Sequence, residues 1–232
     1  CYVDKGKSEI MVKEAIDTSN GKLGVMTENS DNAFMPATIN PFYMVCYSYN
    51  GGETKISADL SSYMNGYQDP RREIYGVTST FDESENITNG FHGLRVGNEY
   101  PIKTGQCYSN VKVEVSSPIM WMNAAEVMFL RAEAALRGWD TEKTPKAYYE
   151  AGIRLSFEQL GAKNVEDYLV STNTPESYKD PLGTYSFSGT PSTISVQWKD
   201  GNFEESLERI ITQKWIANFP LGLEAWAEFR RT

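Results

Sequence analysis

Two adjacent stretches of the chain carry apolar residues at helical spacing. Residues 119–137 place apolar side chains around most of the circumference, which predicts a helix packed on several sides. Residues 146–160 repeat the helical pattern, and Gly138 and Gly161 follow the two stretches as typical helix ends. Because the connection between them is short, residues 118–161 are expected to form an antiparallel helical hairpin.

The seam of this hairpin is expected to hold small residues that let the two backbones approach closely. The small residues on the facing stripes are Ala132, Ala135, Ala147, Ala151 and Gly152. Glu133 and Arg137 stand four residues apart in the order that favours an ion pair, and we expect this pair on the solvent face of the first helix.

Outside the hairpin the apolar pattern changes character twice. Residues 22–117 are punctuated by Gly, Asn, Ser and Pro, which predicts an irregular region of loops with little β-structure. Within it, the strict alternation of Val111–Val115 predicts one half-buried strand. Near the start, residues 8–16 indicate a short helix, with Ser8 as its N-cap.

The last third of the chain combines a long loop with further helices. Residues 171–202 are rich in Ser, Thr, Pro and Gly, and a loop of that length is usually functional or wraps a larger body. Residues 203–232 return to helical spacing, with Trp226 and Phe229 expected as apolar anchors of the last segment. The whole pattern predicts a mainly α fold with a loop-rich, irregular region.

Composition and charge narrow the possible functions. The 232 residues are 40% hydrophobic, which is enough for a substantial core, and no run of 18 apolar residues predicts a membrane-spanning helix. A net charge of −9 without a Lys/Arg cluster excludes a nucleic-acid partner. Tyrosine is abundant, at 14 residues, and such rings serve either as packed core or as a surface for a ligand.

Residues that carry out catalysis or hold metals are sparse. Cys46 and Cys107 allow one disulfide or two buried free thiols, and the only histidine, His92, lies in a Gly-containing loop where a structural role is favoured. The acidic stretches at residues 82–85 and around Asp180 are typical of solvated loops. No nucleophile motif or phosphate-binding loop is present, so neither an enzyme nor a cofactor or metal site is expected.

The aromatic segment before a Gly-Gly turn is the strongest candidate for ligand binding. If this segment is extended, Tyr43, Tyr47 and Tyr49 share one face and Asn50 lies at the tip. Rings presented in this way stack on the apolar faces of sugar rings, while a nearby amide binds the hydroxyl groups. The alternative, at about equal weight, is that the three rings pack beneath the loops as core.

Several segments in the same order resemble one protein family. The segments are Asn29–Ala33, Asp69–Arg71, Ala124–Gly138, Ala147–Arg154, Ile211–Ala217 and Glu224–Thr232. Together they resemble the SusD/RagB family of outer-membrane nutrient-binding lipoproteins, and they extend over nearly the whole chain. The resemblance implies tetratricopeptide-like helical hairpins that carry an irregular ligand-binding region.

The resemblance also implies a function and a location. Family members bind glycans at the extracellular face of the outer membrane, without catalysis, and deliver them to a SusC-like TonB-dependent transporter. They are about twice as long as this chain, so we expect residues 1–232 to be one partial domain from the C-terminal part. The lipid anchor is then expected upstream of Cys1. The family's glycan contacts follow no motif that is found here.

Two other functions remain open at this stage. The same architecture could capture peptides for a peptide importer, or it could act as a scaffold that binds ligand only in the transporter complex. The aromatic candidates Tyr43, Tyr47, Tyr49 and Asn50 therefore rest on stacking chemistry alone.

Overall fold

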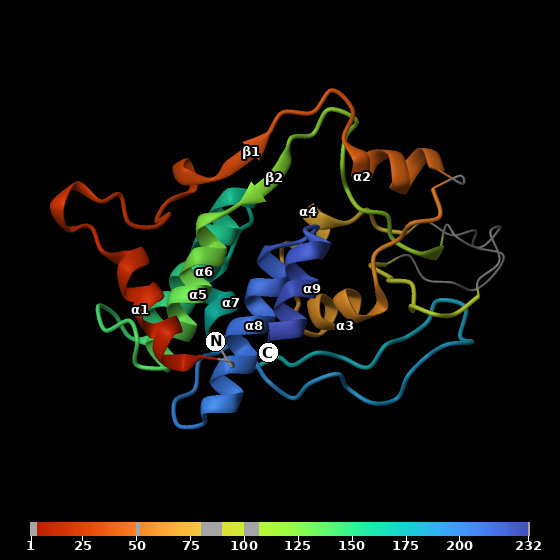
Figure 1. Cartoon of the computed structure of the whole chain (residues 1–232). Helices are drawn as coiled ribbons and strands as arrows, with labels where there is room; N and C mark the ends of the chain where they lie inside the picture. Colours follow the sequence, from red (N-terminus) through yellow and green to blue (C-terminus); the bar gives the residue numbers. More distant parts are fainter. Residues whose placement is uncertain (1–3, 50–51, 80–89, 100–106, 232) are drawn as a thin grey trace. The chain divides into compact units, whose positions relative to one another are not determined.

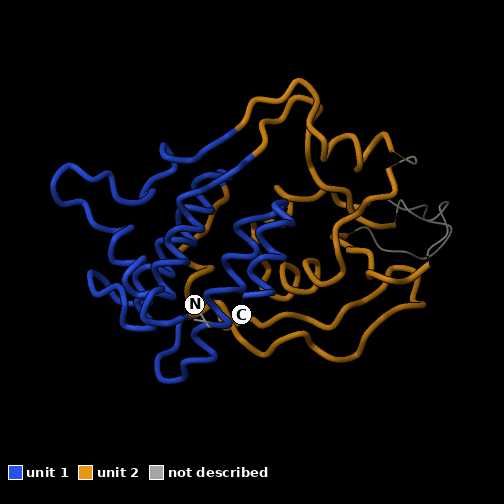
Figure 2. The backbone as a smooth tube through the Cα atoms, viewed as in Figure 1, with its two compact units in different colours: residues 1–34, 120–161, 198–232 blue, residues 35–119, 162–197 orange. Residues whose placement is uncertain are grey.

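The computed structural model describes residues 4–49, 52–79, 90–99 and 107–231. Helices dominate the described part, and its one sheet has two short strands (Figure 1), which confirms the predicted mainly α fold. The chain divides into two compact units (Figure 2). Unit 1 comprises residues 1–34, 120–161 and 198–232, and unit 2 comprises residues 35–119 and 162–197.

Unit 1 is a helical assembly centred on the predicted hairpin. Its helices are α1 (Lys5–Ile16), α5 (Ala124–Leu136), α6 (Pro145–Leu160), α8 (Phe203–Ala217) and α9 (Gly222–Arg231), with short 3-10 turns η1 (Ser19–Gly21) and η2 (Asn29–Asp31). Strands β1 (Ala33–Met35) and β2 (Ile119–Met122) pair, and both include the residues where the chain passes between the units. Helices α5, α6 and α8 pack against one another.

The hairpin of α5 and α6 is confirmed, with one correction at its start. Residues 119–122 form strand β2 and not the first turn of the helix, because Asn123 caps α5: its side-chain oxygen accepts the Glu126 N–H at 2.8 Å. An apolar run of this length does not distinguish strand from helix by its periodicity. Gly138 and Gly161 both adopt positive φ at the helix ends, as predicted.

The seam of the hairpin is as close as its small residues suggested. Phe129 of α5 is fully buried, and a Cβ added to Gly152 of α6 would lie 2.8 Å from two of its ring atoms. Tyr149 packs its ring at an angle against Phe129, with ring centroids 6.2 Å apart. The two helices therefore interlock through one large ring and one missing side chain.

Residues 29–32, which precede β1, form hydrogen bonds to both helices of the hairpin. Asn32 accepts the backbone N–H of Ala124 at 2.7 Å, and its amide nitrogen donates to Gln159 at 3.1 Å. Asn29 donates to the Leu155 carbonyl, also at 3.1 Å. These two asparagines thus join the N-terminus of α5 to the C-terminal turn of α6.

Two predictions about the ends of the chain were wrong. Helix α1 begins at Lys5, and Asp4 caps it by accepting the Lys7 N–H, whereas Ser8 lies inside the helix. On α9, Trp226 and Phe229 stack on each other but are 58% and 75% exposed, so they do not anchor the helix.

Unit 2 contains more helix than its sequence indicated. Its helical elements are α2 (Pro41–Tyr43), the π-helical turn η3 (Met44–Ser48), α3 (Ala58–Gly66), α4 (Arg72–Tyr75) and α7 (Val165–Leu169). Val111–Val115 is not a strand: Val111 makes an isolated bridge with Gly76, and Ser117 N–H closes a turn on Glu114 O. Cys46 and Cys107 are buried free thiols.

The predicted long loop packs over α3 and contributes buried residues to unit 2. Gly66 makes this packing possible, because a Cβ there would lie 2.3 Å from the Glu176 backbone nitrogen. Tyr67 donates its hydroxyl proton to Ile194 O at 3.0 Å, and Tyr178 donates to Gly93 O at 2.7 Å. Among the tyrosines in the described part of the chain, seven are buried: Tyr67, Tyr75, Tyr108, Tyr148, Tyr149, Tyr168 and Tyr178. Much of the tyrosine content therefore belongs to the core.

Candidate ligand-binding region and the buried polar network

The aromatic segment of unit 2 is helical, so the expectation of an extended chain was wrong. Asn40 caps it by accepting the Phe42 N–H at 2.8 Å, and Pro41 occupies the first helical position. The same Asn40 donates its amide to Ser117 O at 2.8 Å and its backbone N–H to Val115 O at 2.7 Å. The Asn-Pro pair is a helix-start signal in the sequence that could have revealed this geometry.

The helical path brings Tyr43 and Tyr47 together one turn apart. Their rings stack with centroids 5.1 Å apart and planes 24° from parallel. The Tyr47 hydroxyl donates to Val111 O at 2.7 Å, and burial raises the pKa of this phenol. Tyr47 therefore holds the stack against the 111–117 segment, and both rings are half-buried.

Tyr49 follows the helical turn and is 66% exposed. Ile39, Met44 and Val45 of the same segment are also exposed large apolar side chains. Segment 39–49 thus presents an apolar and aromatic surface, which can stack on an apolar ligand face. Asn50 lies outside the described residues.

The second acidic stretch proposed from the sequence is not a solvated loop. Asp180 is buried, accepts the Tyr108 hydroxyl at 2.8 Å, and accepts the backbone N–H groups of Thr184 and Tyr185 at 3.0 Å. Burial, together with the neighbouring Asp180 carboxylate, raises the pKa of Tyr108. Asp180 therefore stabilises the conformation of the long loop through buried hydrogen bonds. The stretch at 82–85 lies outside the described residues.

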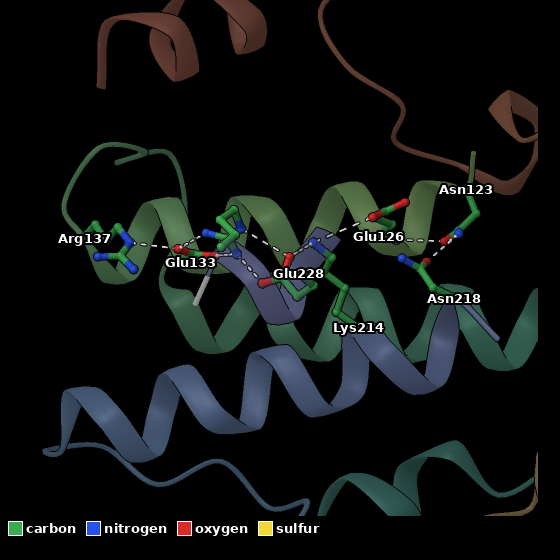
Figure 3. Close-up of polar contacts among 8 residues, drawn as sticks. Asn123, Glu126, Glu133, Arg137, Lys214, Asn218 and Glu228 are labelled. Atoms are coloured by element: carbon green, nitrogen blue, oxygen red, sulfur yellow. Dashed lines mark hydrogen bonds and ion pairs between the residues drawn. The ribbon is translucent and has the colours of Figure 1, made fainter. Parts of the chain in front are cut away.

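Unit 1 holds a second concentration of polar groups, in a network among α5, α8 and α9 (Figure 3). Glu133 accepts from Arg231 Nη2 at 2.5 Å and from Arg137 Nε at 2.9 Å. Lys214 Nζ donates to Glu228 at 2.5 Å, and Glu228 also pairs with Arg231. Glu133 and Arg137 thus form the predicted pair, but Glu133 is buried and not on a solvent face.

Burial and ion pairing act oppositely on the two carboxylates of α5. Burial alone would raise the pKa of Glu133, but its ion pairs with Arg231 and Arg137 outweigh this effect and lower it. Burial raises the pKa of Glu126, whose nearest cation, Lys214, is 3.7 Å away. Because each carboxylate faces a cation from another part of the unit, the network joins helices together.

The described residues hold neither a metal-ligand cluster nor a membrane-spanning helix. In that part of the chain, no three His, Cys, Asp or Glu side chains gather closely enough to hold a metal ion. None of the helices it contains is long and apolar enough to cross a bilayer. His92 belongs to the loop packing of unit 2. Its backbone N–H donates to the Ser109 hydroxyl at 3.1 Å.

The described residues form a mainly α protein with a helical scaffold and an irregular, loop-rich unit, and comparison with known proteins identifies the family. The family described as "SusD-like: Susd and RagB outer membrane lipoprotein" matches residues 1–232. The chain belongs to the SusD/RagB family, which confirms the resemblance seen in its motifs. A search of curated proteins gives no match.

Solved structures agree with this assignment. A SusD homologue from Bacteroides thetaiotaomicron is 41% identical, with a TM-score of 0.88 over 97% of this chain and 46% of its own. One from Bacteroides uniformis is 43% identical, with a TM-score of 0.87 over 100% and 48%. A chitin-binding SusD homologue from Flavobacterium johnsoniae is 38% identical, with a TM-score of 0.82 over 96% and 47%. This chain therefore spans less than half the length of these relatives.

Proposed function

We propose that this protein binds glycans without catalysis at the extracellular face of the outer membrane. The family description, which names outer-membrane lipoproteins, and a chitin-binding relative at 38% identity support this proposal. In this function the protein delivers its ligand to a SusC-like TonB-dependent transporter and is held at the membrane by a lipid anchor upstream of Cys1.

The observation that carries the binding site is the aromatic surface of segment 39–49. The stacked Tyr43–Tyr47 pair is fixed by the Val111 hydrogen bond, and Tyr49 is exposed beside it in the sequence. A fixed pair of rings loses little conformational freedom when a sugar ring stacks on its outer face. In this proposal Tyr43 and Tyr49 stack on sugars, Tyr47 supports Tyr43, and Asn50 binds hydroxyl groups.

Retention on chitin and on a panel of polysaccharide gels tests this site. Tyr43→Ala and Tyr49→Ala are expected to weaken retention roughly 2- to 10-fold each, because a stacked ring contributes about 0.5–1.5 kcal/mol. Phe229→Ala is the control, since it removes another exposed aromatic ring, 75% exposed against 66% for Tyr49, from α9 of unit 1. Unchanged retention of the Tyr43→Ala/Tyr49→Ala double variant would remove this surface as the site.

The same preparation separates the competing functions. Capture of peptides in place of glycans would favour the peptide-importer alternative, and release of reducing ends over hours would show a hydrolase. Retention that emerges only when the transporter is present would favour the scaffold alternative.

A further inference from the structure

Unit 2 contains a polar cavity that is separate from the tyrosine surface. It has a volume of about 210 Å³ and lies where the turn after α3 meets α7 and the start of the long loop. Its lining residues are Tyr67, Gln68, Pro70, Asn164, Asp167, Tyr168, Ser171 and Asn173. Two segments almost a hundred residues apart in the sequence thus build one concave surface.

The wall of the cavity is rigid at Tyr168. The Tyr168 hydroxyl donates to Asp69 Oδ2 at 2.7 Å and accepts from Arg71 Nη2 at 3.2 Å, and the Arg71 guanidinium lies 5.4 Å from the centre of the Tyr168 ring. Asp69 and Arg71 form a fully buried ion pair with an N···O distance of 2.6 Å. Tyr168 is 4% exposed, so these contacts fix the wall of the cavity and keep its shape preorganised.

The rim of the cavity carries unusual backbone geometry. Three non-glycine residues in the described part of the chain have positive φ, and two of them, Gln68 at 53° and Asn164 at 62°, line this cavity. Left-handed backbone is unfavourable for residues other than glycine, and residues that hold it concentrate at functional sites. At both positions a carboxamide stands on backbone that glycine adopts without strain, so glycine can replace either residue without a change of backbone.

The rim side chains are available to a ligand. Within the described residues, the side chains of Gln68, Asn164, Asp167 and Asn173 make no hydrogen bond or ion pair with the protein. The three amides supply donors and acceptors, and the carboxylate supplies acceptors. Each of these groups can therefore exchange water for a ligand without breaking an internal contact.

The chemistry of the lining selects the class of ligand. No Lys or Arg lines the cavity, which disfavours phosphate or another anion, and a single carboxylate, Asp167, is too few for a divalent cation site built on acidic ligands. The polar rim disfavours a purely apolar ligand. A neutral ring with several hydroxyls fits the amides around this cavity, where Pro70 offers a half-buried apolar surface and the buried Tyr67 and Tyr168 form the wall behind it.

We propose that this cavity is a second binding site that takes one ring of a saccharide, such as a chain end or a free monosaccharide. The volume is below the roughly 300–1,000 Å³ of pockets for larger ligands, so the site holds a single ring. The site is built from residues other than those of segment 39–49, and its occupancy does not require the tyrosine surface.

Saturation-transfer NMR with free glucose, galactose, mannose, xylose and N-acetylglucosamine tests the proposal, with inorganic phosphate and Ca²⁺ as counter-probes. At least one sugar is expected to bind the unaltered protein. Gln68→Gly and Asn164→Gly should each weaken that binding about tenfold, because each removes a carboxamide and keeps the positive φ. Thermal stability should not fall in either variant, so lost binding cannot be attributed to unfolding.

Asn20→Gly provides the matched control. Asn20 is the third described non-glycine residue with positive φ, at 54°, but it lies in η1 of unit 1, away from the cavity. Sugar binding should be unchanged in this variant. Absence of any sugar signal, phosphate or Ca²⁺ binding in place of sugar, or full binding by the Gln68→Gly/Asn164→Gly double variant would overturn the proposal. Tyr49→Ala should keep monosaccharide binding, so this outcome and that of the tyrosine surface are separable.

Discussion

The buried ion pair beneath the cavity leads to a prediction about stability. The side chains of Asp69 and Arg71 are 0% exposed, and their closest N···O distance is 2.6 Å. Glu9 and Lys13 on α1 have the same 2.6 Å distance but are 40% and 58% exposed. The two pairs share this distance but differ in burial, and the buried pair also makes more hydrogen bonds, so the comparison contrasts a buried, fully bonded ion pair with an exposed one.

Arg71→Met should destabilise the protein by about 3–5 kcal/mol, since it leaves the Asp69 carboxylate buried without its cation. Lys13→Met should cost only about 0.3–0.5 kcal/mol, because water solvates the remaining carboxylate of an exposed i,i+4 pair. For a chain of this length the first value corresponds to a loss of roughly 6–20 °C in Tm.

Urea unfolding followed by circular dichroism measures both variants, with equal slopes as the check that the unfolded state is unchanged. The Asp69→Asn/Arg71→Met double variant should be less destabilised than Arg71→Met alone, because it no longer strands a buried charge. Equal losses for Arg71→Met and Lys13→Met, or a double variant at least as unstable as the sum of its single changes, would refute the reasoning.

Two further predictions concern unit 1. Gly152→Ala gains about 1 kcal/mol of helix propensity. It also forces a Cβ to within 2.8 Å of the buried Phe129 ring, an overpacking cost of about 1–3 kcal/mol, so urea unfolding should show a lower free energy of unfolding. A more stable variant would contradict the close packing of the two helices. In unfolding measured from about pH 2 to pH 8, Glu133→Gln should lack a stabilising contribution that the native protein has in full above the ordinary Glu pKa and loses as pH falls through the lowered folded pKa of Glu133. Glu126→Gln should show the opposite sign, because its raised folded pKa makes native stability decrease as pH rises through it, so the variant gains at neutral pH; profiles with the same sign would refute the assignment.

Local sequence signals were sufficient to predict the helical hairpin. They failed where a capping side chain or a buried polar side chain, and not the hydrophobic pattern, determines the local structure. Gly138 and Gly161 mark helix ends by their own conformational freedom, and no distant contact is needed to find them. Residues 119–122 had the composition of a helix, and only the Asn123 cap fixes where the helix starts. Helix α3 was missed because its buried face includes Ser61 and Ser62, which a hydrophobicity pattern counts as solvent-facing.

The candidate site shows the same division. The sequence alone indicates the tyrosines of segment 39–49 as candidates. Their arrangement depends on whether Asn40-Pro41 starts a helix. Positions 43 and 47 stack because they are one turn apart, a geometry that an extended chain does not give. The Gln68–Asn164 cavity could not be predicted, since it exists only where two distant segments meet and where the backbone turns left-handed.

The motifs that revealed the family are positions where the scaffold places polar groups against the interior. The Asp69–Arg71 motif is a buried ion pair, and Glu133, Lys214 and Glu228, from three other motifs, meet in one network. A buried charge is tolerated only with its own partner, so such residue types cannot be exchanged one at a time. The motifs therefore specify how the helices assemble. In our two proposals, ligand choice rests on the exposed segment 39–49 and on the rim of the polar cavity, whose side chains can change without disturbing that framework.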